Sequence, residues 1–419
     1  MGPITLIDKS FLQSLSFDEA AIFDCLYATN ICPIFFVETL ADLKKNFPNS
    51  KPEDEVGRIA GRTPAMHSYP NVHHRELCLG NLLGQPIEMS RVPTVGGGVP
   101  VRSKDGKVGI YFESPPEQKA MSRWHQGRFH EIEQDFAATW RKQLQLSDLK
   151  SETDKFLSRL GYSGNPKNLV EAKNLAEELV RGNGRRFATL KAIWSSLGLR
   201  PQYWPQVLRK WKDAGGPSLN IFAPYAAFCL TIDVFFYICI KKGLISAERA
   251  SNKVDVGYLY YLPFCMLFVS NDRLHAQIAP LFLTDAQIFV PGAELKAELN
   301  KLNLYYSAME EVIAKEGLIR VASRPPPGDF LTRRLWESAF QTKVPDSLPL
   351  PMKAAKAPQT LLDEVKEMQN VAKKSAGTSF SRQQLADPDR VTLERHVRIN
   401  MGKWRLFPEG INPMSDVDE

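Results

Sequence analysis

The chain has few cysteines, and none of them is arranged for a disulfide framework or a zinc site. Six cysteines occur among 419 residues, all in apolar surroundings and without a C-x-x-C pair. Small secreted domains space their cysteines regularly, and structural zinc sites bring them close together in the sequence. We therefore expect a reducing, cytoplasmic environment.

Segments that would carry the chain into or across a membrane are also scarce. The N-terminus has neither the basic stretch nor the long apolar stretch of a signal peptide. Residues 221–240 are apolar enough to imitate a membrane span, but they include Pro224 and a central Asp233. An aspartate at the centre of a bilayer is costly, so we expect a buried core helix and no membrane partner.

Several motifs of well-known enzyme classes are missing. Gly96-Gly97-Gly98 is not followed by the Gly-Lys-Ser/Thr of a phosphate-binding loop, and no Gly-X-Ser-X-Gly motif occurs. His125 and His130 are five residues apart, whereas a zinc-binding helix places its histidines four apart. These patterns argue against ATP binding, serine-hydrolase chemistry and zinc.

The balance of charge excludes little. Fifty-three Lys and Arg against 47 Asp and Glu give a formal net charge of +6 and a pI near 8.8. This permits a polyanionic partner, but it is mild compared with the charge of dedicated DNA-binding domains.

Short apolar runs alternate with helical patterns near the N-terminus. Residues 4–7 predict a strand that ends at Asp8, and a helical pattern follows. Residues 31–36 predict a second strand, which leads into a helical pattern that contains Glu38. This β-α-β-α opening is typical of a parallel sheet covered by helices.

The remainder of the chain divides by composition. Residues 48–220 contain frequent Pro, Gly and His and then mainly helical patterns, which predicts a large helical insertion. Apolar segments resume within 221–285, where residues 256–269 predict a fully buried strand. We expect a discontinuous α/β core of residues 1–47 and 221–285, a helical extension over 286–340, and a Pro/Lys-rich linker and polar tail over 341–419. The tail is expected either to be partly disordered or to dock as an arm.

Four acidic residues stand where predicted strands end or helices begin: Asp8, Glu38, Asp255 and Asp272. The carboxyl ends of neighbouring parallel strands meet in one crevice, where ligands bind. Clustered carboxylates there suit Mg²⁺ or Mn²⁺, which prefer hard oxygen ligands. We therefore expect the four acids to converge on a site for one of these ions.

These acids and their surroundings resemble the spaced acidic motifs of the PIN-domain superfamily. The resemblance rests on Asp8 after an apolar strand, on Glu38 in Phe-Phe-Val-Glu-Thr-Leu, and on Asp255 followed by Val-Ser-Asn-Asp ending at Asp272. It covers residues 1–45 and 221–285, and the long stretch between them departs from the family pattern.

The resemblance implies a three-layer α/β/α fold that hydrolyses phosphodiesters, mostly in RNA, with a divalent metal. By position, Asp8 matches the aspartate after the first strand and Glu38 matches the glutamate carried by a helix. Asp255 matches the aspartate that opens the penultimate helix, and Asp272 matches the one after the late core strand.

Each acid also has a structural interpretation without chemistry. Asp8, Asp255 and Asp272 all precede helical patterns and would serve as N-caps. Glu38 lies in an apolar stretch, where an unpaired carboxylate is costly, so a functional role is favoured for it. Asp233 is a secondary candidate, either as a fifth ligand or as a helix carboxylate paired with a lysine.

Further residues are candidates for contacting a nucleic acid. His275 follows Asp272 by three residues and would lie one helical turn beyond it. Basic and aromatic residues are mixed between positions 200 and 212, a combination that binds phosphates and stacks bases. The substrate-binding candidates are Ser270, Asn271, His275, Arg209, Lys210 and Lys212.

The sequence supports three functional hypotheses. The favoured one is a Mg²⁺- or Mn²⁺-dependent endonuclease that acts on nucleic acid, with RNA as the expected substrate. The second is a non-catalytic protein of PIN-like descent that regulates by binding nucleic acid or protein. The third is an unrelated α/β protein in which the acids are helix caps; a protein partner or a homo-oligomer is compatible with each of them.

Overall fold

A computed structural model of the chain describes residues 1–102, 106–182, 184–346, 370–372 and 379–410. At its centre lies a five-stranded, all-parallel sheet of order β3-β2-β1-β6-β7. The strands are β1 (Ile4–Ile7), β2 (Ala28–Ile31), β3 (Ser68–Pro70), β6 (Leu267–Ser270) and β7 (Ile288–Pro291). The parallel sheet expected from the alternating strand and helix patterns is confirmed.

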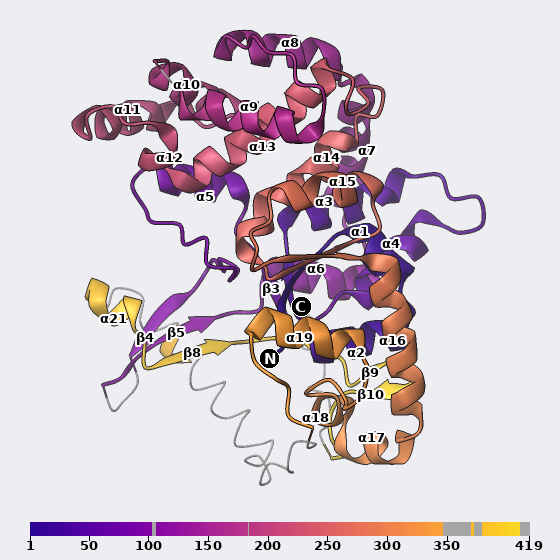
Figure 1. Cartoon of the computed structure of the whole chain (residues 1–419). Helices are drawn as coiled ribbons and strands as arrows, with labels where there is room; N and C mark the ends of the chain where they lie inside the picture. The colour runs from indigo at the N-terminus through magenta and orange to yellow at the C-terminus, as the bar shows by residue number, and fades with distance from the viewer. Residues whose placement is uncertain (103–105, 183, 347–369, 373–378, 411–419) are drawn as a thin grey trace.

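Helices cover the sheet, as parallel strands require when both of their faces are buried (Figure 1). The N-terminal ones are α1 (Lys9–Ser14), α2 (Phe17–Leu26), α3 (Pro33–Ala41) and α4 (Pro52–Arg62). Ser16 caps α2 in a capping box with Glu19, and this fixes where the helix begins. The arrangement is α/β and agrees with an α/β/α core.

A group of helices lies beyond one end of the sheet, at the top of Figure 1. It comprises α5 (His74–Leu82), α8 (Leu149–Leu160), α9 (Leu169–Arg181), α10 (Arg186–Leu197), α11 (Trp204–Asp213), α12 (Leu219–Phe222) and α13 (Pro224–Lys241). Helix α13 runs through this group and packs against α5, α8 and α9. By length and composition α13 could cross a membrane, but 78% of that segment is buried inside the molecule.

Helix α7 (Glu131–Leu146) packs against α3, while α14 (Asn252–Gly257) and the 3-10 helix η3 (Tyr258–Phe264) contact α13. Helix α6 (Pro116–His125) packs against α4. After the sheet come α15 (Arg273–Ile278), α16 (Gly292–Ser307), α17 (Glu310–Glu316), α18 (Leu318–Val321) and α19 (Leu331–Phe340).

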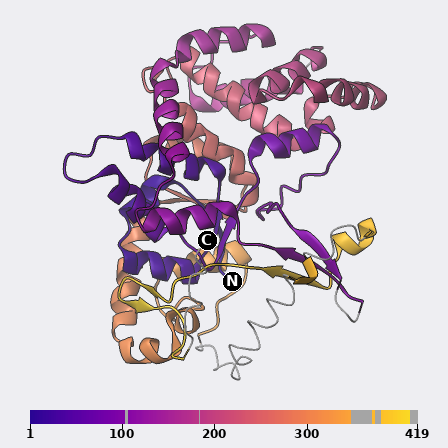
Figure 2. The same cartoon turned by 180° about the vertical axis from the view of Figure 1, so that it is seen from behind.

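A second sheet projects from the core and includes part of the C-terminal tail (Figures 1 and 2). Strand β5 (Val108–Phe112) pairs with β4 (Val99–Arg102) and, in parallel, with β8 (Arg390–Leu393). Strands β9 (Asn400–Met401) and β10 (Trp404–Arg405) form a short hairpin, and α21 (Arg382–Ala386) precedes β8. The described part of the tail is therefore docked as an arm, while residues 347–360 of the predicted linker lie outside the described residues.

The structure corrects several predicted boundaries. Strand β2 ends at Ile31 rather than running over 31–36, because Pro33 opens helix α3, a position that proline favours. The buried strand predicted over 256–269 is shorter, since residues 258–264 form η3. Strands β3 and β7 lie inside the ranges predicted as insertion and extension, so the sheet extends beyond the predicted core.

Candidate functional site

The order in which the chain adds strands to the sheet reverses between β1 and β6, which is the topological switch point. From β1 the chain continues to β2 and β3 on one side, and β6 and β7 lie on the other side. Neighbouring parallel strands whose connections leave in opposite directions open a crevice at their carboxyl ends, where α/β proteins bind ligands. Asp8 directly follows β1, and Asp272 stands two residues after β6.

Asp8 is buried at this switch point and accepts several hydrogen bonds. One oxygen, Oδ1, caps α1 by accepting from the Phe11 amide at 3.0 Å. The other, Oδ2, accepts from the hydroxyls of Ser10 at 2.6 Å and Ser270 at 2.8 Å. Burial opposes ionisation, but the interactions with His275, Ser10 and Phe11 outweigh it and lower the pKa of Asp8. Asp8 is therefore an ionised, firmly positioned carboxylate.

His275 links this carboxylate to α14. Its Nε2 lies 2.7 Å from the backbone carbonyl of Asp255, which only accepts, so Nε2 carries a hydrogen. Its Nδ1 lies 2.8 Å from Ser270 Oγ and 3.7 Å from Asp8 Oδ2. Burial disfavours the charged ring, but Asp8 and the Asp255 carbonyl raise the pKa of His275. When Ser270 donates to Asp8, Nδ1 also donates to Ser270, and the ring is an imidazolium.

Glu38 reaches the same region from helix α3. Its Oε2 accepts a hydrogen bond from the Tyr258 hydroxyl at 2.7 Å, and its Oε1 lies 3.3 Å from Lys9 Nζ. Lys9 also forms an ion pair with Asp42 at 3.0 Å. The side chain of Glu38 remains 27% exposed, so it is held in place and still open to solvent.

Asp255 and Asp272 share one cation. The guanidinium of Arg249 lies 4.0 Å from Asp255 Oδ2 and 3.9 Å from Asp272 Oδ2, and its side chain is 63% exposed. Asp272 also caps α15 by accepting from the Leu274 amide at 2.6 Å. Burial, together with the charges of Asp272 and Glu38, raises the pKa of Asp255 to about 7.

The Asp255 carboxylate is the least satisfied group at the switch point. Its Oδ2 is buried and has no hydrogen-bond partner among the described residues. A buried acceptor without a partner is unfavourable, and a buried charge more so. A cation bound beside Asp255 and Asp272 would therefore lower the electrostatic cost of ionising Asp255.

The structure brings the four predicted acids into one region but does not arrange them as a finished metal cage. The Ser270 hydroxyl donates to the Asp8 carboxylate and accepts from the Asp272 backbone amide at 2.9 Å. Asp255 and Asp272 face the same arginine. Within the described part of the chain, however, no group of three His, Cys, Asp or Glu side chains is placed to hold one ion.

The secondary candidate Asp233 belongs to a different cluster. It is buried in α13, where it forms an ion pair with Lys253 and accepts hydrogen bonds from Ser196 and from Tyr260 at 2.5 Å. The pairing with lysine is the structural alternative that the sequence left open. Asp233 joins α13 to α14 and is not grouped with the four acids.

The predicted substrate-binding residues separate in the same way. Ser270 and His275 are 2% and 1% exposed, so they contact Asp8 inside the protein and do not form an accessible surface. Asn271 is exposed, and its amide donates to the Ser10 carbonyl at 3.3 Å. Arg209, Lys210 and Lys212 lie on α11 within the helical group, where Lys210 donates to the Leu83 carbonyl.

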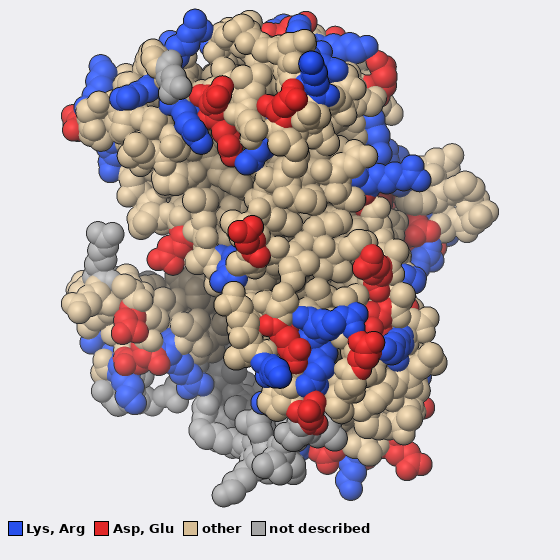
Figure 3. All heavy atoms as spheres, viewed as in Figure 1, with Lys and Arg blue, Asp and Glu red and all other residues tan. Residues whose placement is uncertain are grey.

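Sequence reasoning missed the groups that orient the acids. Lys9 and Ser10 follow Asp8 directly, and their polarity at the start of an apolar helix was a signal for a local role. Arg249 and Tyr258 had no such signal, because they reach the site only through the fold. The basic and acidic side chains are interspersed on the face shown in Figure 3, without one continuous basic surface.

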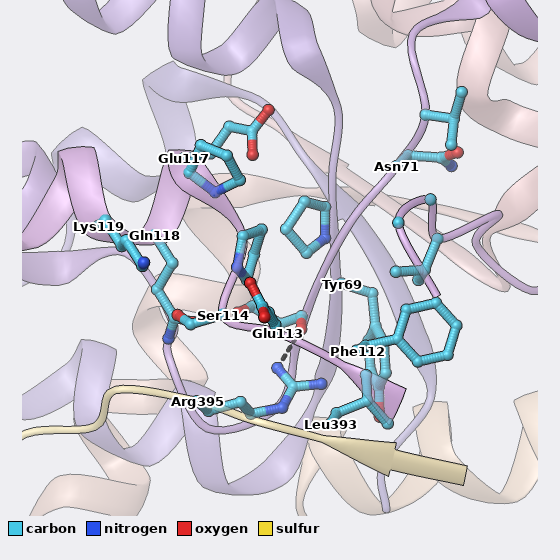
Figure 4. A pocket seen from close by; sticks show the side chains of 18 of the residues that line it. Tyr69, Asn71, Phe112, Glu113, Ser114, Glu117, Gln118, Lys119, Leu393 and Arg395 are labelled. Carbon is cyan, nitrogen blue, oxygen red and sulfur yellow. Dashed lines mark hydrogen bonds between the residues drawn. The ribbon is translucent and has the colours of Figure 1, made fainter. Parts of the chain in front are cut away.

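Two sizeable cavities lie away from the site of the four carboxylates. One, of about 790 Å³, lies beside the edge strand β3 and is seen in Figure 4. There Arg395 donates to the Ser68 carbonyl and lies over the Tyr69 ring, so the outer edge of β3 is partly covered. The other, of about 600 Å³, lies between α3 and α14 and the helical group. None of the four predicted acids lines either cavity.

The candidate site consists of four acids around the switch point between β1 and β6. Asp8 and Asp272 follow the adjacent strands β1 and β6. Asp255 Oδ2 has no hydrogen-bond partner among the described residues, and Glu38 contacts Lys9 and Tyr258. When the chain is compared with models of protein families, with curated proteins and with solved structures, nothing matches it.

Proposed function

We propose that this protein is a divalent-metal-dependent endonuclease that hydrolyses phosphodiester bonds, with RNA as its substrate. Asp255 and Asp272 are the direct metal ligands in this proposal, and Asp8 and Glu38 complete the site. The resemblance to the PIN-domain superfamily, at the same four acids, supports both the reaction and RNA as the substrate.

The observation that carries the proposal is the buried Oδ2 of Asp255. It has no hydrogen-bond partner among the described residues, and its neighbours include the charges of Asp272 and Glu38. Its counter-charges are the exposed guanidinium of Arg249, at 4.0 Å, and the ring of His275. A hard cation that prefers oxygen ligands would further reduce the repulsion between these carboxylates. The donor set therefore fits Mg²⁺ or Mn²⁺.

Each acid has a distinct task in this account. Asp255 Oδ2 has no hydrogen-bond partner among the described residues, and Asp272 Oδ2 faces the exposed Arg249. Asp8 is kept ionised by Ser270 and His275, and it adds fixed negative charge to the crevice. Glu38 is oriented by Tyr258 and is open to solvent, so it is placed to accept a proton from water. A bound divalent metal would supply activation of water and neutralisation of charge on the phosphate.

Arg249 has a role in the metal-free protein. Its guanidinium lies within 4.0 Å of the carboxylates of both Asp255 and Asp272, yet most of its side chain is exposed. It therefore reduces the repulsion between Asp255 and Asp272 without being fixed in place. Binding of a cation would displace it toward solvent, where it is available to a phosphate.

One set of observations favours a second candidate function, a non-catalytic nucleic-acid-binding or protein-binding regulator. Both Asp8 oxygens already accept hydrogen bonds from the chain, and no three acids within the described residues form a ready-made metal site. A protein that had lost catalysis while keeping the fold would tolerate both features.

The two functions are separated by a cleavage assay on labelled single-stranded RNA, structured RNA and DNA. The endonuclease proposal predicts internal cleavage of RNA in Mg²⁺ or Mn²⁺ that EDTA abolishes. Asp255→Asn should remove this activity, while Asp154→Asn, an exposed acid in the helical group, should not. Cleavage that persists in EDTA contradicts the metal mechanism, and an inactive wild-type protein that still binds RNA favours the regulator.

A further inference from the structure

The cavity of about 600 Å³ lies between the core and the helical group, outside the carboxylate site. Its walls come from α3 and α14 on one side and from α7, α8, α10 and α13 on the other. Pockets for small organic ligands have volumes of this size. On α14, Val254 lines the cavity while the next residue, Asp255, belongs to the switch point.

Aromatic rings provide much of the wall. Phe156 and Tyr237 pack with centroids 4.6 Å apart, and Trp140 lines the cavity from α7. On another side His74 lies 4.6 Å from the Tyr260 ring. Flat apolar surfaces of this kind stack on the π-face of any nucleobase.

The rim carries positive charge. Lys155 and Arg159 are exposed on α8, four residues apart, so they project from the same helix face. Of the two acids in the lining, Asp233 pairs with Lys253, whereas Glu152 keeps its charge and accepts from the Ser147 hydroxyl at 2.9 Å. Lys155, Arg159 and Arg75 leave the lining with a net positive charge. A basic pair at the mouth of an aromatic cavity suits a phosphate.

The wall also contains an unsatisfied polar atom. His74 Nδ1 is buried and has no hydrogen-bond partner among the described residues. Burial, together with the charge of His73, lowers the pKa of His74 to about 3, so its ring is neutral and offers one donor and one acceptor. This is the kind of group that pairs with the polar edge of a base.

We propose that this cavity is a nucleotide-binding pocket, in which the base stacks on the aromatic wall and the phosphate binds Lys155 and Arg159. The nucleotide is either a free mononucleotide or the phosphorylated end of an RNA strand, because both present the same chemistry. The pocket goes beyond the proposed endonuclease site, since none of the four acids takes part in it.

Binding is measured on the full chain in EDTA, so the result does not depend on cleavage. Calorimetry with adenosine and uridine 5′-monophosphate tests the free nucleotide. Fluorescence anisotropy with an eight-nucleotide RNA, with and without a 5′-phosphate, tests the strand end. The affected variants are Lys155→Glu/Arg159→Glu and Trp140→Ala. The matched control is Lys315→Glu/Lys343→Glu, which makes the same change of charge at exposed positions away from the helical group.

The proposal predicts saturable binding in at least one arm, with Kd raised at least about tenfold by Lys155→Glu/Arg159→Glu and nearly unchanged in the control. Trp140→Ala should weaken binding without any change in charge. Binding only of the 5′-phosphorylated RNA identifies the strand end, and binding of a monophosphate identifies a free nucleotide. No binding in either arm at about 1 mM ligand overturns the proposal, as does equal weakening by the control.

Discussion

Asp255, a proposed metal ligand, also limits the stability of the folded protein. The unfolded chain leaves its carboxyl with an ordinary pKa of 3.8, whereas burial and the neighbouring acids raise the pKa to about 7 in the folded protein. The folded chain thus binds this proton more tightly than the unfolded chain does. The stability from this group is complete below pH 4 and is lost as the pH rises to 7.

This difference predicts a pH-dependent effect of Asp255→Asn. Asparagine stays neutral, so the metal-free variant should gain stability over the wild type as the pH rises from 4 to 8, by up to about 4 kcal/mol. Urea unfolding of both proteins in EDTA across this range measures the gain. Added Mg²⁺ should stabilise the wild type at pH 8 and not the variant. A constant difference between the two proteins at every pH would show that Asp255 is not perturbed.

At this scale the sequence predicted the acids better than the groups around them. Asp8 and Asp272 were identifiable because each stands within two residues of a strand end, and the order of those strands brings them together. Arg249 and Tyr258 were not, since no local pattern marks a residue whose partner lies far away in the sequence. His275 was recognised as near Asp272, but its burial could not be foreseen from a three-residue spacing.

Among the elements of the central sheet, the sequence predicted strands at β1, β2 and β6 and missed β3 and β7. Strand β1 agrees with its predicted bounds because an aspartate ends it. Strand β3 has three residues, includes Pro70 and lies at the sheet edge, so it offered no alternating pattern. The prediction of β2 slipped forward because Ile34, Phe35 and Phe36 are as apolar as a buried strand, while Pro33 already begins a helix.

The connection between α13 and α14 depends on the Asp233–Lys253 pair. Replacing Lys253 by methionine leaves the buried Asp233 carboxylate without its counter-charge, which should lower the free energy of unfolding. We expect a loss of about 3 kcal/mol, the lower end of the range for buried pairs, because the lysine side chain is 31% exposed. The double variant Asp233→Asn/Lys253→Met should be more stable than Lys253→Met alone, since the lone charge is gone. Urea unfolding of the two single variants and the double variant measures this coupling. Additive effects would mean that the pair does not join the helices.

For the whole molecule, the described part of the C-terminal tail is docked as an arm, which is one of the two alternatives that its polar composition left open. Trp404 is 1% exposed, and its indole donates to Asn303 at 3.1 Å. The Lys403 amide donates to Asp18 on α2 at 2.8 Å. A few apolar residues in a polar segment are enough to dock it, which average composition does not reveal.

The arm can be tested through its buried tryptophan. Trp404→Ala should destabilise the protein by about 3–5 kcal/mol, because it removes a large side chain from a closed site. Phe136→Ala, at a ring that is 39% exposed on α7, should change stability by less than about 1 kcal/mol. Thermal or urea unfolding compares the two variants. Equal small effects would indicate that the arm is not docked in solution.

If the switch point of the sheet holds a metal for phosphodiester hydrolysis, cleavage should depend on the negative charge of Asp8, and Asp8→Asn tests this dependence. Asparagine keeps the size and the capping ability of Asp8 but removes its negative charge. Asp148→Asn is the matched control, because Asp148 also caps a helix, α8, and is exposed. The measurement is the rate of RNA cleavage in Mg²⁺ and Mn²⁺ at equal folded concentration.

We predict that Asp8→Asn lowers the cleavage rate by at least about a hundredfold and leaves the fold intact, while Asp148→Asn cleaves like the wild type. If Asp8 is only a helix cap, the two variants should behave alike, with nearly unchanged stability and activity. An Asp8→Asn protein that cleaves RNA at the wild-type rate would contradict the account.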